Sequence, residues 1–162
     1  MARDIVHLKV EGTRGAVKGE SVAAGHVGEI DVHSFGWKMR SPRDVVTKAA
    51  AARVDYGDLV IEKHIDAAST ALMSMLATNE LVRKAVLSVR RQGVDAEDYL
   101  TLTLTKAHVT GYQLQQSDSG EDRMVEQITL AYESVEVSYA GQEVGGARKG
   151  ATHFHGIAAA SS

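Results

Sequence analysis

The sequence contains no cysteine and only one proline, Pro42, in 162 residues. Without cysteine the chain has no disulfide, no thiolate ligand for zinc and no thiol nucleophile. Proline is one of the residues that protect the edges of β-sheets, so a β-rich chain with a single proline leaves strand edges open to other chains. These absences exclude several classes of enzyme and metal protein, and they favour a protein that associates with others.

An excess of one charge and long apolar runs are also missing. Eighteen basic and 21 acidic residues give a net charge of −3. The chain therefore lacks the excess of positive charge with which proteins bind nucleic acids and anionic membranes. No apolar run is long enough to cross a bilayer, and Met1–Val10 has a strand pattern instead of the apolar core of a signal peptide. We expect no nucleic-acid binding, no membrane insertion, synthesis in the cytoplasm and, on export, secretion without a cleaved signal peptide.

Alternation of apolar and polar residues is abundant. The segment Tyr99–Gln115 begins with leucine at every second position and threonine between, which indicates a strand because side chains on a strand point alternately to its two faces. In the predicted strands 29–39, 99–115 and 124–139 the apolar residues move from even to odd positions. A bulge or corner near His33-Ser34 would explain the first change. A bulge near Glu133-Ser134, or a strand that leaves one sheet for another, would explain the last.

These patterns predict a mainly β fold. Besides the three bent strands, the sequence predicts strands at 3–10, 55–64 and 81–90. Long bent strands shared by two sheets favour a two-sheet β-barrel of antiparallel strands. One segment has helical spacing instead, with apolar residues at intervals of three and four from Leu72 to Leu76. We predict a helix of roughly ten residues, capped by Ser69 or Asp66 and ended by Asn79, which needs packing on the sheet to be stable.

Two segments lack apolar periodicity. Residues 40–54 hold the proline, several basic side chains and four consecutive alanines, and predict a long excursion between two strands. Residues 142–162 are rich in glycine and alanine, and predict a C-terminal tail that is mobile or docked on a partner. The expected division is therefore a β-barrel domain at 1–141 followed by that tail.

Candidates for chemistry are few. The chain has no GxSxG, P-loop, HExxH or paired-cysteine motif. His153 and His155 could ligate a metal together, but two histidines in a glycine-rich tail are more often exposed, because a metal site needs a supported set of ligands. The acids Asp95, Glu97 and Asp98 follow a glycine in a predicted hairpin and favour a solvated turn. We predict a non-enzymatic protein with no cofactor and no metal site.

A charged turn precedes the last predicted strand. Its residues are Gly120, Glu121, Asp122 and Arg123. Its acids could bind a cation, but we favour an ion-paired turn that fixes the register of the strands on either side.

Several segments, taken in order along most of the chain, resemble the Hcp family, the haemolysin-coregulated proteins of type VI secretion systems. The resemblance is carried by GEIDVHSFGW at 28–37, by EKHID at 62–66 leading into the helix, by 99–106, and by GEDR at 120–123 with the strand that follows. It implies a two-sheet β-barrel with one helix on its side, and hexameric rings that stack into a tube. The implied partners are copies of the chain itself, a contractile sheath, a VgrG-type spike and effector proteins held in the tube.

The resemblance also suggests roles for segments that have no core of their own. We expect the 40–54 excursion and the tail to reach the next ring, with candidate stacking contacts at Ser41, Pro42, Arg43, Asp44 and Lys48. The threonine row, Thr101, Thr103 and Thr105, is an ordinary solvent face on the simplest interpretation. In a tube it would instead line a wet channel, because a polar lining lets cargo pass without sticking.

Two alternatives remain open from the sequence. A tail-tube protein of a phage-like injection device would share this architecture. A monomeric β-barrel that binds a small ligand in its interior belongs to a different class, and the bulky apolar residues argue against it, because small barrels are filled by side chains.

Overall fold

The computed structural model describes residues 4–41, 54–92, 97–117, 124–142 and 148–158. The fold is mainly β with one short helix, as predicted. The strands are β1 (Ile5–Gly12), β2 (Gly15–Ala16), β3 (Ile30–Val32), β4 (Ser34–Gly36), β5 (Met39–Arg40), β6 (Asp55–Tyr56), β7 (Leu59–His64), β8 (Val82–Arg90), β9 (Asp98–Gln116), β10 (Met124–Gln142) and β11 (Arg148–Ile157), and the helix is α1 (Ser69–Thr78). Within these described residues, nine strands form one antiparallel sheet in the order β2-β1-β8-β9-β10-β7-β4, with β3 beside β1 and β11 beside β10. β5 and β6 form a separate two-stranded ladder.

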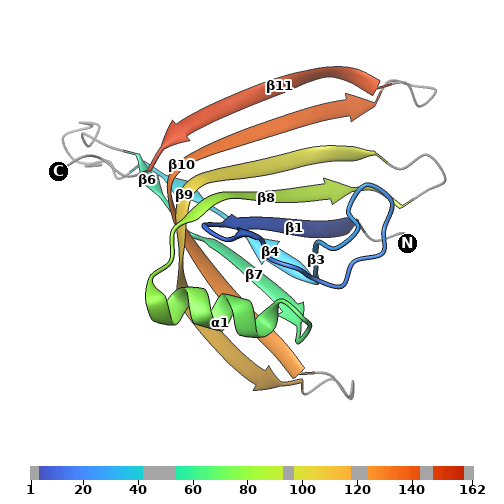
Figure 1. The fold of residues 1–162 in the computed structure, drawn as a ribbon. Helices are drawn as coiled ribbons and strands as arrows, with labels where there is room; N and C mark the ends of the chain where they lie inside the picture. Colours follow the sequence, from blue (N-terminus) through green and yellow to red (C-terminus); the bar gives the residue numbers. More distant parts are fainter. Residues whose placement is uncertain (1–3, 42–53, 93–96, 118–123, 143–147, 159–162) are drawn as a thin grey trace.

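The two longest strands bend and belong to both halves of the sheet. β9 and β10 pair along their length, and one edge of β10 pairs with β7 from Val125 to Leu130 and with β11 from Ser134 to Gln142. Figure 1 shows both strands running from the β8–β11 layer down beside β7. The predicted bending of this strand is therefore confirmed, but β7, β9, β10 and β11 belong to a single sheet, so β10 does not leave one sheet for another, and closure into a two-sheet barrel stays a prediction. The buried positions on β10 change from Tyr132 to Val135, as predicted, but the register with β9 is unchanged from Tyr132 to Ser134 and shifts instead between Thr129 and Leu130, so no bulge lies at Glu133-Ser134.

A sharp corner joins the two halves a second time. β3 pairs with β1 and β4 pairs with β7, with only His33 between them. The His33 backbone N–H donates to the Glu62 carbonyl over 2.8 Å. The corner predicted near His33-Ser34 is confirmed, and this bent segment bridges β1 and β7.

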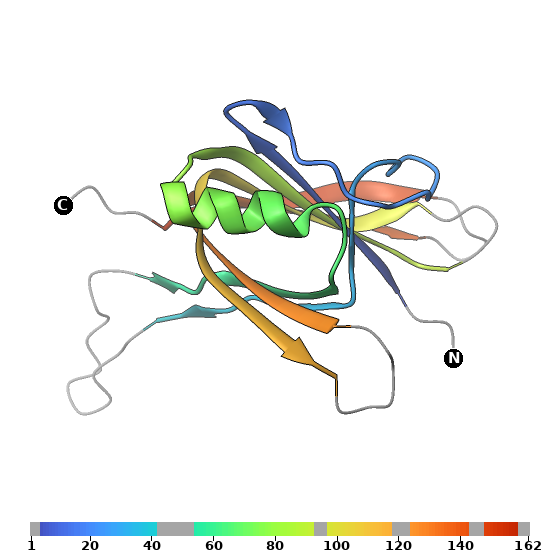
Figure 2. The ribbon, with the colours of Figure 1, turned by 60° about the horizontal axis from the view of Figure 1, so that its bottom comes forward.

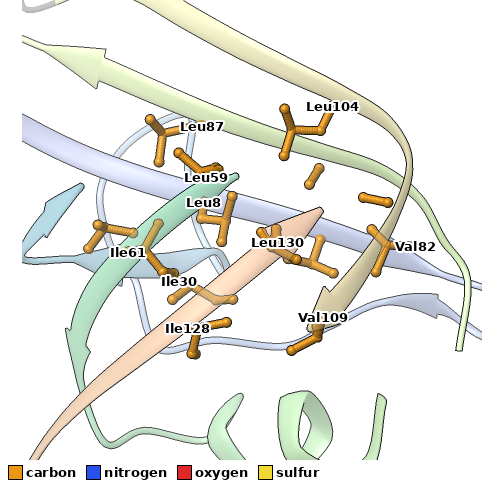
Figure 3. Close-up of a cluster of buried hydrophobic side chains, with 14 of the residues drawn as sticks. Leu8, Ile30, Leu59, Ile61, Val82, Leu87, Leu104, Val109, Ile128 and Leu130 are labelled. Carbon is orange, nitrogen blue, oxygen red and sulfur yellow. The ribbon is translucent and has the colours of Figure 1, made fainter. Parts of the chain in front are cut away.

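The core lies between the two halves of the bent sheet. The apolar residues that alternate along β1, β3, β7, β8, β9 and β10 point into it (Figure 3), and the fully buried ones include Leu8, Ile30, Leu59, Ile61, Leu87, Leu104, Ile128 and Leu130. On β9 the buried side chains lie at even positions up to Leu104 and at odd positions from Ala107. Lys106 lies between them with a positive φ of 51°, so the strand turns there and the phase change has a local cause.

The helix covers one open side of the sheet (Figure 2). Leu72 and Met75 are buried under it, as its spacing predicts. Asn79 ends it in the left-handed conformation with φ 53°, also as predicted. The N-terminal prediction was wrong, because the N-cap residue is Ala68 and no side chain caps the helix. Instead, the Asp66 backbone N–H donates to Ser69 Oγ and the Ala68 backbone N–H donates to Asp66 Oδ1, each over 2.9 Å.

The C-terminal segment contradicts the prediction of a mobile or partner-docked tail. Arg148–Ile157 forms strand β11, which pairs antiparallel with β10. The Ala158 backbone N–H then donates to the Glu133 carbonyl over 2.7 Å. Glycine suits position 156 of this strand, because the ring of Tyr56 lies against it. A Cβ on Gly156 would lie 2.6 Å from Tyr56 Oη.

We expect Gly156→Ala to destabilise the chain by about 1–3 kcal/mol, because the Tyr56 ring must move to admit a methyl group. Gly150→Ala is the matched control on the same strand, since a Cβ there would meet no atom of the described residues within 4 Å beyond its chain neighbours. Thermal or urea unfolding of both variants at one protein concentration measures the difference. Equal stability of the two variants would contradict the close approach of Tyr56.

Candidate assembly surfaces

A short ladder carries the ends of the predicted excursion. Met39 pairs with Tyr56 and Arg40 with Asp55, and the Gly57 backbone N–H donates to the Lys38 carbonyl over 2.8 Å. We call residues 37–41 and 54–57 the arm base; Figure 2 shows it extending from the body of the protein. Of the predicted stacking residues, Ser41 is exposed at its end. Pro42, Arg43, Asp44 and Lys48 lie outside the described residues.

A hydrogen-bonded relay fastens the arm base to β10. Trp37 Nε1 donates to the Tyr132 hydroxyl over 2.6 Å, and that hydroxyl donates to the Gly57 carbonyl over 2.6 Å. Burial raises the pKa of Tyr132, so its hydroxyl keeps its proton for this bond. Through Tyr56 the arm base also contacts Gly156 of β11. The strand before the excursion, the strand after it and the C-terminal strand are thereby held together.

The threonine row lies on the sheet face that is turned away from the core. Leu102 and Leu104 are buried between the threonines. Thr101 lies between Ser88 of β8 and Ser138 of β10. The neighbours of Thr103 are Val86 and Glu136, and those of Thr105 are Lys84 and Ser134. We call this surface the threonine face; its polar character agrees with the alternation in the sequence.

The two C-terminal histidines lie on strand β11 beside the threonine face. His153 pairs with Ser138 and His155 with Glu136. His153 Nδ1 lies 3.7 Å from Glu136 Oε1, and both of these side chains are more than half exposed. Within the described part of the chain no three His, Asp or Glu side chains are arranged to hold a metal ion. The same residues include no helix with the length and apolar character needed to cross a membrane.

The three acids predicted to form a solvated turn, Asp95, Glu97 and Asp98, have different outcomes. For Asp98 the prediction of a solvated turn was wrong, because its carboxylate pairs with His26 from a distant loop over 2.9 Å. Glu97 is exposed, and Asp95 lies outside the described residues. So do Gly120, Glu121, Asp122 and Arg123, and their role in strand register stays a prediction.

A buried polar cluster was not predicted. Lys63 of β7 forms an ion pair with Glu126 of β10, and both side chains are fully buried. Lys63 Nζ also donates to Ser69 Oγ over 3.1 Å and to the His64 carbonyl over 3.0 Å, and lies 2.8 Å from Asp66 Oδ1. Ser69 Oγ donates to Glu126 Oε1 over 2.7 Å. The available signal was the alternation itself, which places Lys63 in phase with Leu59 and Ile61.

Tyr112 completes this cluster from β9. Its hydroxyl donates to Glu126 Oε2. Burial and that hydrogen bond raise the pKa of Tyr112, so it remains a donor. The cluster therefore connects β7, β9, β10 and the first residue of α1.

Comparison with known proteins decides the family. A family model described as "Type VI secretion system effector, Hcp" matches residues 7–139. The chain belongs to the Hcp family. Protein hcp1 of Pseudomonas aeruginosa is 32% identical over 139 residues, which cover 84% of this chain and 85% of that protein.

Solved Hcp structures share the fold. The crystal structure of Hcp1 from Salmonella typhimurium matches with a TM-score of 0.77 and 25% identity, over 98% of this chain and 96% of that chain. A structure described as that of a type six secretion system protein matches with a TM-score of 0.83 and 24% identity, over 93% and 92% of the two chains. The chain is therefore a type VI secretion protein of a family of secreted structural proteins, and that family is not one of enzymes.

Proposed function

We propose that the chain is the subunit of a type VI secretion tube, in which hexameric rings stack and are expelled together with effector proteins. The observation that carries the proposal is the arm base. It is a separate ladder, fastened to β10 through Trp37 and Tyr132. The 12 residues between its two strands, 42–53, have a sequence without apolar periodicity. A segment whose sequence has no apolar face to bury within its own subunit, and whose two ends are fixed to the sheet, is suited to contact with another subunit.

The proposed mechanism is mechanical. Lateral contacts between different patches of neighbouring copies close the ring, because a head-to-tail contact forms a ring when the rotation per subunit fits. The 42–53 segment reaches the next ring. A contractile sheath drives the tube outward behind a VgrG-type spike, and the chain itself makes and breaks no covalent bond. It is made in the cytoplasm and is secreted.

The threonine face is the proposed lining of the channel. Thr101, Thr103 and Thr105 offer hydroxyl groups, and their neighbours on β10 are Ser134, Glu136 and Ser138. A second polar surface competes for this role, where Gln127 of β10 lies between Glu62 of β7 and Gln113 of β9. Rings of Thr103→Cys and of Gln127→Cys can be treated with a cysteine-specific reagent, with and without a bound effector. The face on which the effector slows labelling of the cysteine is the lining of the channel.

A second function, a monomeric binder with an interior ligand, has less support. Apolar side chains from β1, β7, β9 and β10 meet in the interior (Figure 3), and Leu8, Ile61, Leu104 and Leu130 are fully buried there. A core packed in this way leaves its members in contact with one another and not with a ligand. A phage-like tail tube remains the alternative within the same class.

The mass of the purified chain in solution tests the proposal. We expect sedimentation equilibrium to give about six times the monomer mass of 17.4 kDa, and negative-stain micrographs to show rings. A chain that stays monomeric at high concentration, and that retains a small molecule through purification, would contradict the tube and support the interior binder.

A further inference from the structure

A loop between β2 and β3 folds back on itself and lies beside the ends of β8 and β9 (Figure 1). Inside this loop, which spans Gly19–Glu29, the Gly19 N–H donates to the Gly28 carbonyl and the Gly28 N–H donates to the Ser21 carbonyl, each over 2.8 Å. Two of its polar contacts reach the sheet. Arg90 Nη1 donates to the Ala24 carbonyl over 3.0 Å, and His26 pairs with Asp98, the first residue of β9.

His26 has a carboxylate at each ring nitrogen. Nδ1 lies 2.9 Å from Glu29 Oε1, and Nε2 lies 2.9 Å from Asp98 Oδ2 and 3.0 Å from Oδ1. A carboxylate can only accept a hydrogen bond, so both ring nitrogens must donate. The neutral ring has one donor and one acceptor nitrogen. Only the imidazolium satisfies both partners, and the geometry therefore requires a charged His26.

A second histidine lies face to face with the first. The ring centroids of His7 and His26 are 4.4 Å apart and their planes differ by 12°. His7 is 1% exposed, and its Nε2 lies 3.4 Å from Asp31 Oδ1. Among the residues that the structure describes, its Nδ1 has no hydrogen-bond partner. A proton on that Nδ1 would be a buried donor without an acceptor, beside a charged ring. His7 is therefore the neutral member of the stack.

The electrostatic surroundings agree with this assignment. Burial acts to lower the pKa of His26, but its hydrogen bonds to Glu29 and Asp98 outweigh burial and raise that pKa. Burial and the charge on His26 lower the pKa of His7. The charged groups that face the pair are Asp31 from β3, Arg90 from β8, Glu29 from the loop and Asp98 from β9.

We propose that His26 is a proton-operated latch, which holds the Gly19–Glu29 loop on the start of β9 when its ring carries a charge and releases it when the proton is lost. The neutral ring can donate to only one carboxylate, and its bare nitrogen then faces the other. The loop carries Val22 and Val27, which are exposed while it is held, so release would change the position of these apolar side chains relative to the start of β9. A secreted protein that moves between compartments of different pH would thus present two states of this surface.

The sign of the effect follows from the two histidines. Because the pKa of His26 is raised in the folded chain, the latch contributes fully below the ordinary histidine value of about 6.5 and is lost as the pH rises through the raised pKa. His7 acts in the opposite direction, since its lowered pKa makes protonation at acidic pH unfavourable to the folded state. The loop is therefore held most firmly in a window of mildly acidic pH.

Nuclear magnetic resonance titration of the intact chain, combined with hydrogen exchange, tests the latch. We expect the His26 ring to titrate above about 6.5, and the protection factors of the Gly28 and Glu29 amides, corrected for the intrinsic effect of pH, to fall with the same midpoint. Asp98→Asn should lower the His26 pKa and move that midpoint with it. Glu29→Gln, which removes the other carboxylate, should do the same and provides a second variant if the first fails to fold.

Two controls make the result specific. His26→Gln should leave the protection of the loop independent of pH over this range. His155→Gln, which replaces an exposed histidine on β11, should leave the midpoint unchanged. A His26 ring that titrates at or below the ordinary value, or loop protection that stays constant through its titration, would overturn the proposal.

Discussion

Replacing Lys63 with methionine is expected to destabilise the folded chain by about 3–5 kcal/mol, because it leaves the fully buried carboxylate of Glu126 without its positive partner. Methionine has a similar length and fills the same space, so the loss is electrostatic and not a cavity effect. Urea unfolding measures the change in the free energy of unfolding. All variants must be compared at one protein concentration, because self-association adds to apparent stability.

The double variant Lys63→Met with Glu126→Leu separates charge burial from packing. Replacing both partners of a buried ion pair with apolar residues is often neutral or stabilising, so we expect much of the loss to be recovered. Part of the loss of stability should remain, since the hydroxyls of Ser69 and Tyr112 lose Glu126, the hydrogen-bond acceptor that they share. A double variant less stable than Lys63→Met would show that the unpaired carboxylate of Glu126 is not what destabilises the single variant.

Lys106→Met is the matched control on the surface. Lys106 and Glu133 are 3.7 Å apart, and their side chains are 63% and 49% exposed. Exposed pairs of this kind contribute about 0–1 kcal/mol. If Lys63→Met costs no more than Lys106→Met, the buried cluster does not hold the sheet and the helix together.

The cluster also explains how the helix begins without a side-chain cap. Ser69, its first residue, donates to Glu126 and accepts from Lys63. The start of α1 is thus bonded to two strands of the sheet, and these contacts replace the local cap that the sequence predicts. A short helix depends on such tertiary contacts more than on its intrinsic propensity.

Local periodicity predicted most of the strands, because the alternation of faces is a property of the strand alone. It placed Leu102 and Leu104 in the core and the threonines outside, and the phase change in 29–39 located the corner at His33. The partners of buried polar residues could not be found in this way. His26 and Asp98 are 72 positions apart, and only the folded sheet brings them together.

Strand β11 shows a second limit of local patterns. Its sequence is rich in glycine and small residues, which have low intrinsic preference for strands. Backbone hydrogen bonds to β10 determine its structure, and the close approach of Tyr56 requires the glycine at 156. A feature that disfavours a strand locally is here a condition for packing two segments against each other.

Deleting residues 41–52 is expected to abolish long tubes while sparing the rings, because the proposed contact with the next ring lies in this segment. The ladder makes the deletion practical. Arg40 pairs with Asp55, so the deletion leaves only Arg53 and Val54 between two paired residues, the length of a tight β-hairpin loop. Changing these two residues to Asn-Gly supplies the turn that such a loop prefers.

Three measurements on the deletion variant give separate answers. Circular dichroism and unfolding should match the full chain, since the relay from Trp37 through Tyr132 to Gly57 is retained. Sedimentation should still give rings. Negative-stain micrographs, at a concentration where the full chain forms tubes, should show rings alone. The full chain with only Arg53→Asn and Val54→Gly is the control, and it should still form tubes.

The possible contrary results point to different parts of the molecule. Loss of the fold would mean that residues 41–52 support the bent sheet, although the pairing of Arg40 with Asp55 does not need them. Loss of rings would place the segment in the lateral contact between neighbours. Tubes that persist would assign stacking to other surfaces, and β11 would be the next candidate, because Tyr56 of the arm base packs against its Gly156 and the two elements share one side of the subunit.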